Sequence, residues 1–294
     1  MLPIAGSHSI VSAQSTDCTP SRTPDITTHV NVLLNGSAKN YHVATWGSRA
    51  AEDHLFPESG VMLRQPWIDA TDFERRVAQL PQAERLALRQ WTSTEDEGGR
   101  YSDNTKVISS GMNYELNAKL ASGEPLSTEE SNMVVNMDRA LIDLPTLSGE
   151  FLRVAEHSRD CPPPWGSIIQ VGDVVSNFPC FMSASTTADY AIETLENQGM
   201  VNPDGTNAIV IYKIVSSDSN GTGIPLLQGP LSDVNENEVL FSRNSCFSVE
   251  GFSVARPIDD AGDDLEIRVS VLLNQIFPQV NAKNLFSGKD VALP

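Results

Sequence analysis

The sequence predicts an α+β fold, with helices in the first half of the chain and strands in the second. Apolar residues recur at helical spacing from about Asp69 to Leu144. After Pro145, short apolar runs alternate with Gly, Pro, Asn and Ser, which is typical of strands joined by turns. Helices followed by strands favour segregated elements over a doubly wound sheet, and no G-x-G-x-x-G or P-loop motif is present.

The N-terminal residues predict an extension. Residues 1–28 are rich in Ser, Thr and Pro with few charges, so they bury too little apolar surface to offset the entropy lost on ordering. His29–Leu34 reads as an isolated strand, and residues 35–60 give no clear pattern. We therefore divide the chain into a mobile leader or extension over residues 1–60 and a single domain over residues 61–294.

The leader also bears on localisation. Its first Lys or Arg is Arg22, so a secretory signal with a charged beginning is not indicated. Ser-rich leaders with few charges are compatible with export by needle-type bacterial secretion systems. We therefore expect a secreted protein, delivered into a host cell by that route.

Helical spacing accounts for the stretch that follows. Two apolar stripes, separated by Pro81, comprise Phe73, Val77 and Leu80, then Leu86, Leu88 and Trp91. A short helix is predicted over Met112–Leu120, ending near Gly123. Ser127 and Glu130 make a capping box for another helix, whose apolar stripe comprises Met133, Met137, Leu141 and Leu144.

Eight short apolar runs after Pro145 predict strands. They are Phe151–Ala155, Ile168–Val171, Val174–Val175, Phe181–Met182, Ala208–Val215, Val239–Phe241, Cys246–Val254 and Leu265–Leu273. One helix interrupts them, because Thr186 and Asp189 suggest a start and Gly199 an end.

Composition excludes several functions. The net charge of −18 argues against general binding to nucleic acid or to an anionic membrane surface. No run approaches the roughly 20 apolar residues that a membrane-spanning helix needs. The four cysteines form no C-x-x-C pair and have no histidine at ligand spacing, so neither a metal site nor a disulfide framework is indicated.

Glu236 and Glu238 are candidate catalytic residues because they lead directly into the apolar run Val239–Phe241. Two residues apart at the start of a strand, their carboxylates would lie on one face. Paired acids beside an apolar wall can stabilise a cation or move a proton. The alternative is a chance E-x-E in an acidic protein.

Arg153 and Ser183 complete the candidate site. Arg153 lies between apolar neighbours in a predicted strand, so its guanidinium should reach a cleft or an acid, and its planar fork suits a diphosphate or a carboxylate. The alternative is an exposed arginine on an edge strand. Ser183 follows the run Phe181–Met182 and can orient a neighbouring carboxylate, whereas Ser185 and Thr186 read as helix caps.

The order of these motifs resembles the arginine-specific mono-ADP-ribosyltransferases, the R-S-E class that includes bacterial toxins and plant-pathogen effectors. The matching segments are FLRVAE, GDVVSNFPCFMSAST and NENEVLFSRNSCFSV, and Tyr114–Leu120 is similar to a preceding helix of that family. The resemblance covers roughly residues 65–275. It implies a helical N-terminal part packed on a two-sheet, β-sandwich-like core. One departure is Ala184, where the family usually has Thr.

The resemblance also implies the chemistry. NAD would be the substrate, with no metal, and ADP-ribose would pass to an accessible arginine of a target protein. Glu238 would stabilise the oxocarbenium-like transition state, Glu236 would orient the acceptor guanidinium, Arg153 would hold the NAD phosphates and Ser183 would orient Glu238.

Three further points stay open. Phe181 and Tyr190 are candidates for the aromatic wall around nicotinamide. Water as the acceptor would make the chain an NAD glycohydrolase. A degenerate transferase fold that acts as a binding module is the other alternative, and Ala184 is the one residue that favours it.

Overall fold

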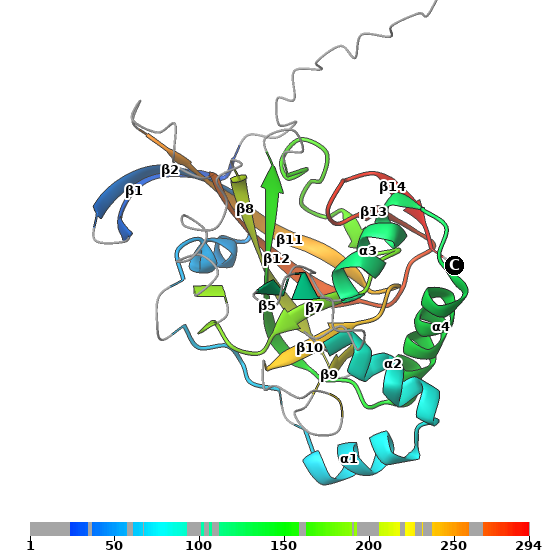
Figure 1. The fold of residues 1–294 in the computed structure, drawn as a ribbon. Helices are drawn as coiled ribbons and strands as arrows, with labels where there is room; N and C mark the ends of the chain where they lie inside the picture. Colours follow the sequence, from blue (N-terminus) through cyan, green and yellow to red (C-terminus); the bar gives the residue numbers. More distant parts are fainter. Residues whose placement is uncertain are drawn as a thin grey trace, which may run out of the picture.

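The computed structural model describes residues 24–34, 37–57, 61–66, 68–92, 101–102, 106–107, 112–158, 163–189, 191–192, 206–217, 221–226, 231, 237–258 and 267–293 (Figure 1). It has an α+β architecture in which helices pack against an extensive, mostly antiparallel sheet. No helix among these residues is long and apolar enough to cross a membrane.

The first elements are a hairpin of β1 (Ile26–Leu34) and β2 (Ser37–Gly47), followed by the 3₁₀ helix η1 (Arg49–His54). β2 pairs antiparallel with β11 (Cys246–Pro257) from Gly47 opposite Gly251 to Tyr41 opposite Pro257. Tyr41 and Val43 are buried in a small core with Leu55. The expected boundary at residue 60 is therefore wrong as a structural division, because β2 is a strand of the main sheet. Residues 1–23 lie outside the described part of the chain.

The helices between residues 70 and 143 follow the predicted spacing. They are α1 (Ala70–Gln79), α2 (Gln82–Thr92), α3 (Met112–Ser122) and α4 (Thr128–Asp143). The predicted break at Pro81 and the capping box of Ser127 and Glu130 are both present. Inward-facing side chains of these helices share a core with Phe181, Ile224 and Leu240 from the strands. The helices therefore cover one face of the sheet at the end opposite the β1–β2 hairpin (Figure 1).

The remaining strands lie in the second half of the chain, except for β3 and β4, which form a separate two-stranded sheet earlier in the chain. They are β3 (Tyr101–Ser102), β4 (Lys106–Val107), β5 (Gly149–Ser158), β6 (Val174–Ser176), β7 (Met182–Ser185), β8 (Thr206–Ser216), β9 (Gly223–Pro225), β10 (Glu238–Phe241), β12 (Ile267–Ile276), β13 (Asn281–Asn284) and β14 (Asp290–Ala292).

The main sheet runs in the order β14-β13-β6-β11-β12-β8-β5-β7-β10-β9, with β2 and then β1 joined to the side of β11. Pairing is antiparallel except between β12 and β8 and between β13 and β6. One edge of β11 pairs with β6 near its start and with β2 over the rest of its length. Pairing thus links all twelve strands into one branched sheet and does not divide them into the two sheets of the expected sandwich.

Two sequence predictions for strands differ from the structure, and some short strands were not predicted. The run Ile168–Val171 forms turns, with only an isolated bridge from Ile169 to Trp165. The strand expected at Phe181–Met182 runs instead from Met182 to Ser185, so Ser183 lies inside it. β9, β13 and β14 were not predicted, because three or four residues carry too little alternation to recognise. Of the helix predicted from Thr186 to Gly199, only the first turn lies within the described residues.

Candidate active site

The structure places the three predicted motifs on neighbouring strands. β7 lies between β5 and β10, so the segments around residues 153, 183 and 238 are adjacent although far apart in sequence (Figure 1). Leu152 pairs with Ser185, and Ser185 pairs with Glu238 on its other side. One row of residues therefore crosses all three strands and ends at Glu238.

Strand pleating sorts these side chains between the two faces of the sheet. Residues in one cross-strand row project to the same face, and alternate residues along a strand do the same. Ser183 and Ser185 therefore share the face of Glu238, which is the face covered by the helices. Arg153 follows Leu152 by one position and leaves from the opposite face, together with its partner across the ladder, Tyr212.

Arg153 reaches β7 through the main chain. Its Nη1 donates a hydrogen bond of 2.7 Å to the carbonyl oxygen of Ser183, and its guanidinium lies 5.6 Å from the ring centre of Phe286. Arg153 thereby ties β5, β7 and the turn after β13 together. β5 lies inside the sheet and Arg153 is partly buried, so the alternative of an exposed arginine on an edge strand is wrong.

Ser183 lies against the helices. The indole Nε1 of Trp91, in α2, is 3.4 Å from its Oγ, a long hydrogen bond in which the indole donates. Ser185 differs from it, because its Oγ accepts from the backbone N–H of Thr187 at 3.1 Å, in keeping with a capping role. The side chain closest to Glu238 in register is thus engaged in a local turn.

Ala184 faces away from Glu238. It is 6% exposed and packs in the apolar core with Val239 and Tyr212. Since Ser183 and Ser185 lie on the other face, Ala at this position does not remove a hydroxyl from the side of the sheet that carries Glu238. The departure at Ala184 therefore gives no structural support to a degenerate site.

The acidic turn has a defined backbone at its second residue. Asn237 has φ of 51°, in the left-handed region that Asn tolerates better than most residues. Its carbonyl accepts from Thr186 N at 2.9 Å, and the carbonyl of Glu238 accepts from Leu226 N at 2.9 Å. Glu238 opens β10 and is partly exposed.

Glu236 lies outside the described residues. Extended backbone through residue 237 would place Glu236 on the face of Glu238, but Asn237 has a left-handed φ of 51°, so that expectation has no basis in the backbone. Alternation along β10 begins only at Glu238.

Of the two aromatic candidates, Phe181 is a core residue. It is 1% exposed, its ring centre lies 5.3 Å from that of Trp91 in an edge-to-face contact, and the Arg243 guanidinium lies 5.6 Å from the ring. Tyr190 lies outside the described residues.

Cys180, which precedes Phe181, is also buried. Burial raises the pKa of its thiol to about 11, so the thiol is neutral near pH 7.

Sequence reasoning missed the side chains that hold β7 in place, above all Asn117 of α3. Its amide makes two hydrogen bonds to the main chain of Phe181, one accepted from the N–H at 3.0 Å and one donated to the carbonyl at 2.9 Å. An Asn on a helix gives no signal of such a contact. The similarity of Tyr114–Leu120 to a family helix was the nearest indication.

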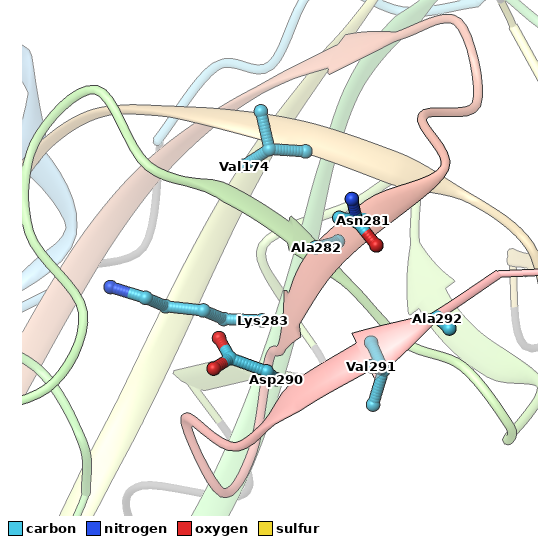
Figure 2. A pocket seen from close by; sticks show the side chains of 7 residues that line it. All are labelled: Val174, Asn281, Ala282, Lys283, Asp290, Val291 and Ala292. Atoms are coloured by element: carbon cyan, nitrogen blue, oxygen red, sulfur yellow. The ribbon is translucent and has the colours of Figure 1, made fainter.

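A shallow surface pocket of roughly 550 Å³ lies elsewhere, at the β13–β14 end of the sheet (Figure 2). Lys283 stands opposite Asp290 across these two strands, and its Nζ lies 2.6 Å from Asp173. The lining of this pocket contains none of the predicted site residues. No group of three or more His, Cys, Asp or Glu side chains comes together as a metal site within the described ranges.

Comparisons with known proteins give similarity in structure alone. No protein-family model and no curated protein sequence matches the chain. The structure is similar to those of ADP-ribosyltransferases, the family that the sequence motifs resemble.

Three solved structures illustrate the similarity. Vis toxin, an ADP-ribosyltransferase from Vibrio splendidus, is 18% identical, with a TM-score of 0.44 over 76% of this chain and 91% of that one. Vis in complex with the inhibitor M6 has a TM-score of 0.49 at the same identity and coverage. Exoenzyme S from Pseudomonas aeruginosa, bound to human 14-3-3 protein beta and carba-NAD, is 17% identical, with a TM-score of 0.40 over 77% of this chain and 88% of that one.

Proposed function

We propose that this protein transfers ADP-ribose from NAD to an arginine side chain of a target protein and releases nicotinamide. The observation that carries the proposal is the adjacency of β5, β7 and β10, which brings the arginine, serine and glutamate motifs side by side. Each motif alone is short, and the proposed chemistry needs all three close together. In this fold the three strands that carry them are neighbours in the sheet.

The reaction needs a carboxylate at the ribose. When the bond between nicotinamide and ribose breaks, nicotinamide leaves with the electron pair and the ribose gains oxocarbenium character. Glu238 would stabilise this developing positive charge. The acceptor nitrogen of arginine then bonds to the ribose carbon and gives up a proton. No redox step occurs.

Ser183 and Arg153 have supporting roles in the proposal. Ser183 lies on the face of Glu238, two residues along β7 from Ser185, the residue that pairs with Glu238, and its hydroxyl can help orient the carboxylate. Arg153 uses one N–H on the Ser183 carbonyl. Because Arg153 leaves β5 from the face opposite Glu238, the role that its geometry supports is to hold β7 in place, and contact with the NAD phosphates is the role that the resemblance implies.

Glu236 would select the acceptor. A carboxylate binds a guanidinium through two parallel hydrogen bonds, so an acid two residues before Glu238 favours arginine over other side chains. We expect Glu236→Gln to lose transfer to arginine while NAD hydrolysis persists. Separate assays of labelled protein and of free nicotinamide measure the two activities, and equal loss of both would contradict this division of roles.

The proposal is tested by transfer of labelled ADP-ribose from NAD to polyarginine and to host-cell proteins. We expect Glu238→Ala to slow transfer at least ~100-fold, because removing one group aimed at transition-state charge typically costs ~3–4 kcal/mol. Glu250→Gln, at an exposed position on β11, is the matched control and should retain activity. Undiminished labelling of the acceptor by Glu238→Ala would contradict the proposal.

The same assay separates the alternatives. Release of nicotinamide without labelled protein would identify an NAD glycohydrolase. Failure of the wild-type protein to bind NAD in calorimetry would indicate a binding module.

We also propose that the protein is a secreted effector and that residues 1–23 direct its export through a needle-type system. The Ser-rich composition of that segment supports the proposal. Fusing these residues to a reporter in a strain with such a system tests it, and secretion equal to that of the unfused reporter would refute it.

A further inference from the structure

The chain entering β7 is held by a side chain instead of a strand. Phe181 immediately precedes β7, and its N–H and carbonyl both bond to the Asn117 amide of α3, at 3.0 Å and 2.9 Å. Two residues of an antiparallel pair exchange the same two hydrogen bonds. Asn117 therefore takes the place of a paired strand residue at this point.

This contact matters because β7 has little other support on one side. β5 pairs with β7 at a single position, Leu152 opposite Ser185, close to the end of β7. The start of β7 depends instead on Asn117, whose backbone carbonyl also lies 3.5 Å from the Cys180 sulfur.

The contact is linked to Ser183 through Trp91. Phe181 and Ser183 are two residues apart and face the helices together. Trp91 touches both, with its ring 5.3 Å from Phe181 and its Nε1 3.4 Å from the Ser183 hydroxyl. A displacement of Phe181 would therefore move Ser183 relative to Trp91 and relative to Glu238, which pairs with the same strand.

We infer that Asn117 is a positioning residue for the active site, which sets the place of Ser183 and, through the β7–β10 ladder, of Glu238. The inference rests on the proposed function. Misplacement of reacting groups by about 1 Å can cost roughly 100-fold in rate, so a side chain that fixes a strand at one end can control kcat without touching substrate.

The substitution Asn117→Asp tests this role. It preserves size and the acceptor for the Phe181 N–H, but it turns an anionic oxygen toward the Phe181 carbonyl. We expect kcat for nicotinamide release at neutral pH to fall about tenfold or more, with KM for NAD within about twofold. Protonation of the introduced carboxylate restores a donor, so the activity of the variant relative to wild type should recover as pH falls.

The matched control is Thr45→Val. Thr45 is buried at the far end of the sheet and bonds to Glu52 and Ser253, so its loss lowers stability without reaching β7. We expect its kcat to equal that of wild type. If Asn117→Asp does not fold, Asn117→Ser replaces it, because it removes the paired bonds without adding a charge.

A double-substitution cycle with Ser183→Ala distinguishes positioning from general destabilisation. If Asn117 acts through Ser183, the two losses in kcat should be clearly less than multiplicative. Multiplicative losses, or a kcat equal to that of Thr45→Val, would overturn the inference. An inactive wild-type protein would instead refute the proposed function, and the positioning role with it.

Discussion

The ladders on the two sides of β5 differ sharply in length. β5 pairs with β8 from Gly149 opposite Ser216 to Ser158 opposite Thr206, whereas it pairs with β7 only at Leu152. The long ladder is a scaffold that main-chain hydrogen bonds hold by themselves. On the short side, Asn117, Arg153 and Trp91 supply contacts that the ladder lacks. Side chains thus support the edge of β7 that faces β5, whereas its other edge pairs with β10 along the whole strand.

This difference has a functional meaning. A short strand that side chains support on one edge can carry Ser183 beside the strand of Glu238, while the adjacent long strands stay rigid. Functional groups are commonly carried on such segments beside a rigid framework. Substitutions on the two sides of β5 should therefore fail in different ways, the scaffold losing stability and the site losing rate.

The largest effect is expected from Phe151→Ala in the scaffold. Phe151 is fully buried and meets Phe241 edge to face with ring centres 5.6 Å apart. Truncation of a buried Phe costs about 3–5 kcal/mol, so urea unfolding should show a loss of that size. A loss below about 1 kcal/mol would show that this side does not carry the stability assigned to it.

The next effect concerns the pH dependence of stability and His54, a buried residue of η1. Burial lowers the pKa of its imidazole to about 4, with the charge of Lys213 contributing in the same direction. A depressed pKa means that the folded state favours the neutral form. The contribution of neutral His54 to the free energy of unfolding is therefore fully present above the unfolded pKa of about 6.5. It is lost as pH falls toward 4, by up to about 3 kcal/mol.

Urea unfolding between pH 7 and pH 4 measures this contribution. We expect His54→Leu to flatten the pH dependence over that range, and His29→Gln, at an exposed histidine of β1, to leave it unchanged. An unaltered slope in His54→Leu would assign the acid sensitivity to other groups.

The smallest effect should arise at the acidic turn. Asn237 has φ of 51°, so Asn237→Gly should change the free energy of unfolding by only a few tenths of a kcal/mol, whereas Asn237→Val should cost about 1–2 kcal/mol. Because Glu238 follows directly, the Val variant should also lose rate. Thermal melts and transfer assays on the pair of variants check this, and equal behaviour of Gly and Val would argue against a left-handed residue 237.

The sequence predicts the parts of this fold that have strong periodicity. The stripes of α1, α2 and α4, the capping box at Ser127, and the long runs of β8, β11 and β12 all follow from spacing and composition. β2 was missed because its polar and apolar residues read as mixed composition, and its partner β11 lies some 200 residues further along the chain. Non-local pairing of that kind leaves no mark in a local window.

The candidate site divides in the same way. Residue types and the order of the motifs, through the resemblance to a known family, led to Arg153, Ser183 and Glu238 as candidates, and their roles stay predictions. The face that each occupies could not be predicted, because it depends on register between distant strands. One left-handed residue, Asn237, interrupts the alternation that assigns side chains to faces, and the pattern of residues does not show it.

The pairing of β2 with β11 also governs how this protein can be handled. A shortened chain that begins at residue 61 would strip β11 of its neighbour from Gly251 to Pro257. Unpaired N–H and carbonyl groups along an exposed edge recruit strands from other molecules, and such edges are common starting points for aggregation. A truncation made to remove the leader should therefore end before Ile26, where β1 begins, if the product is to stay soluble.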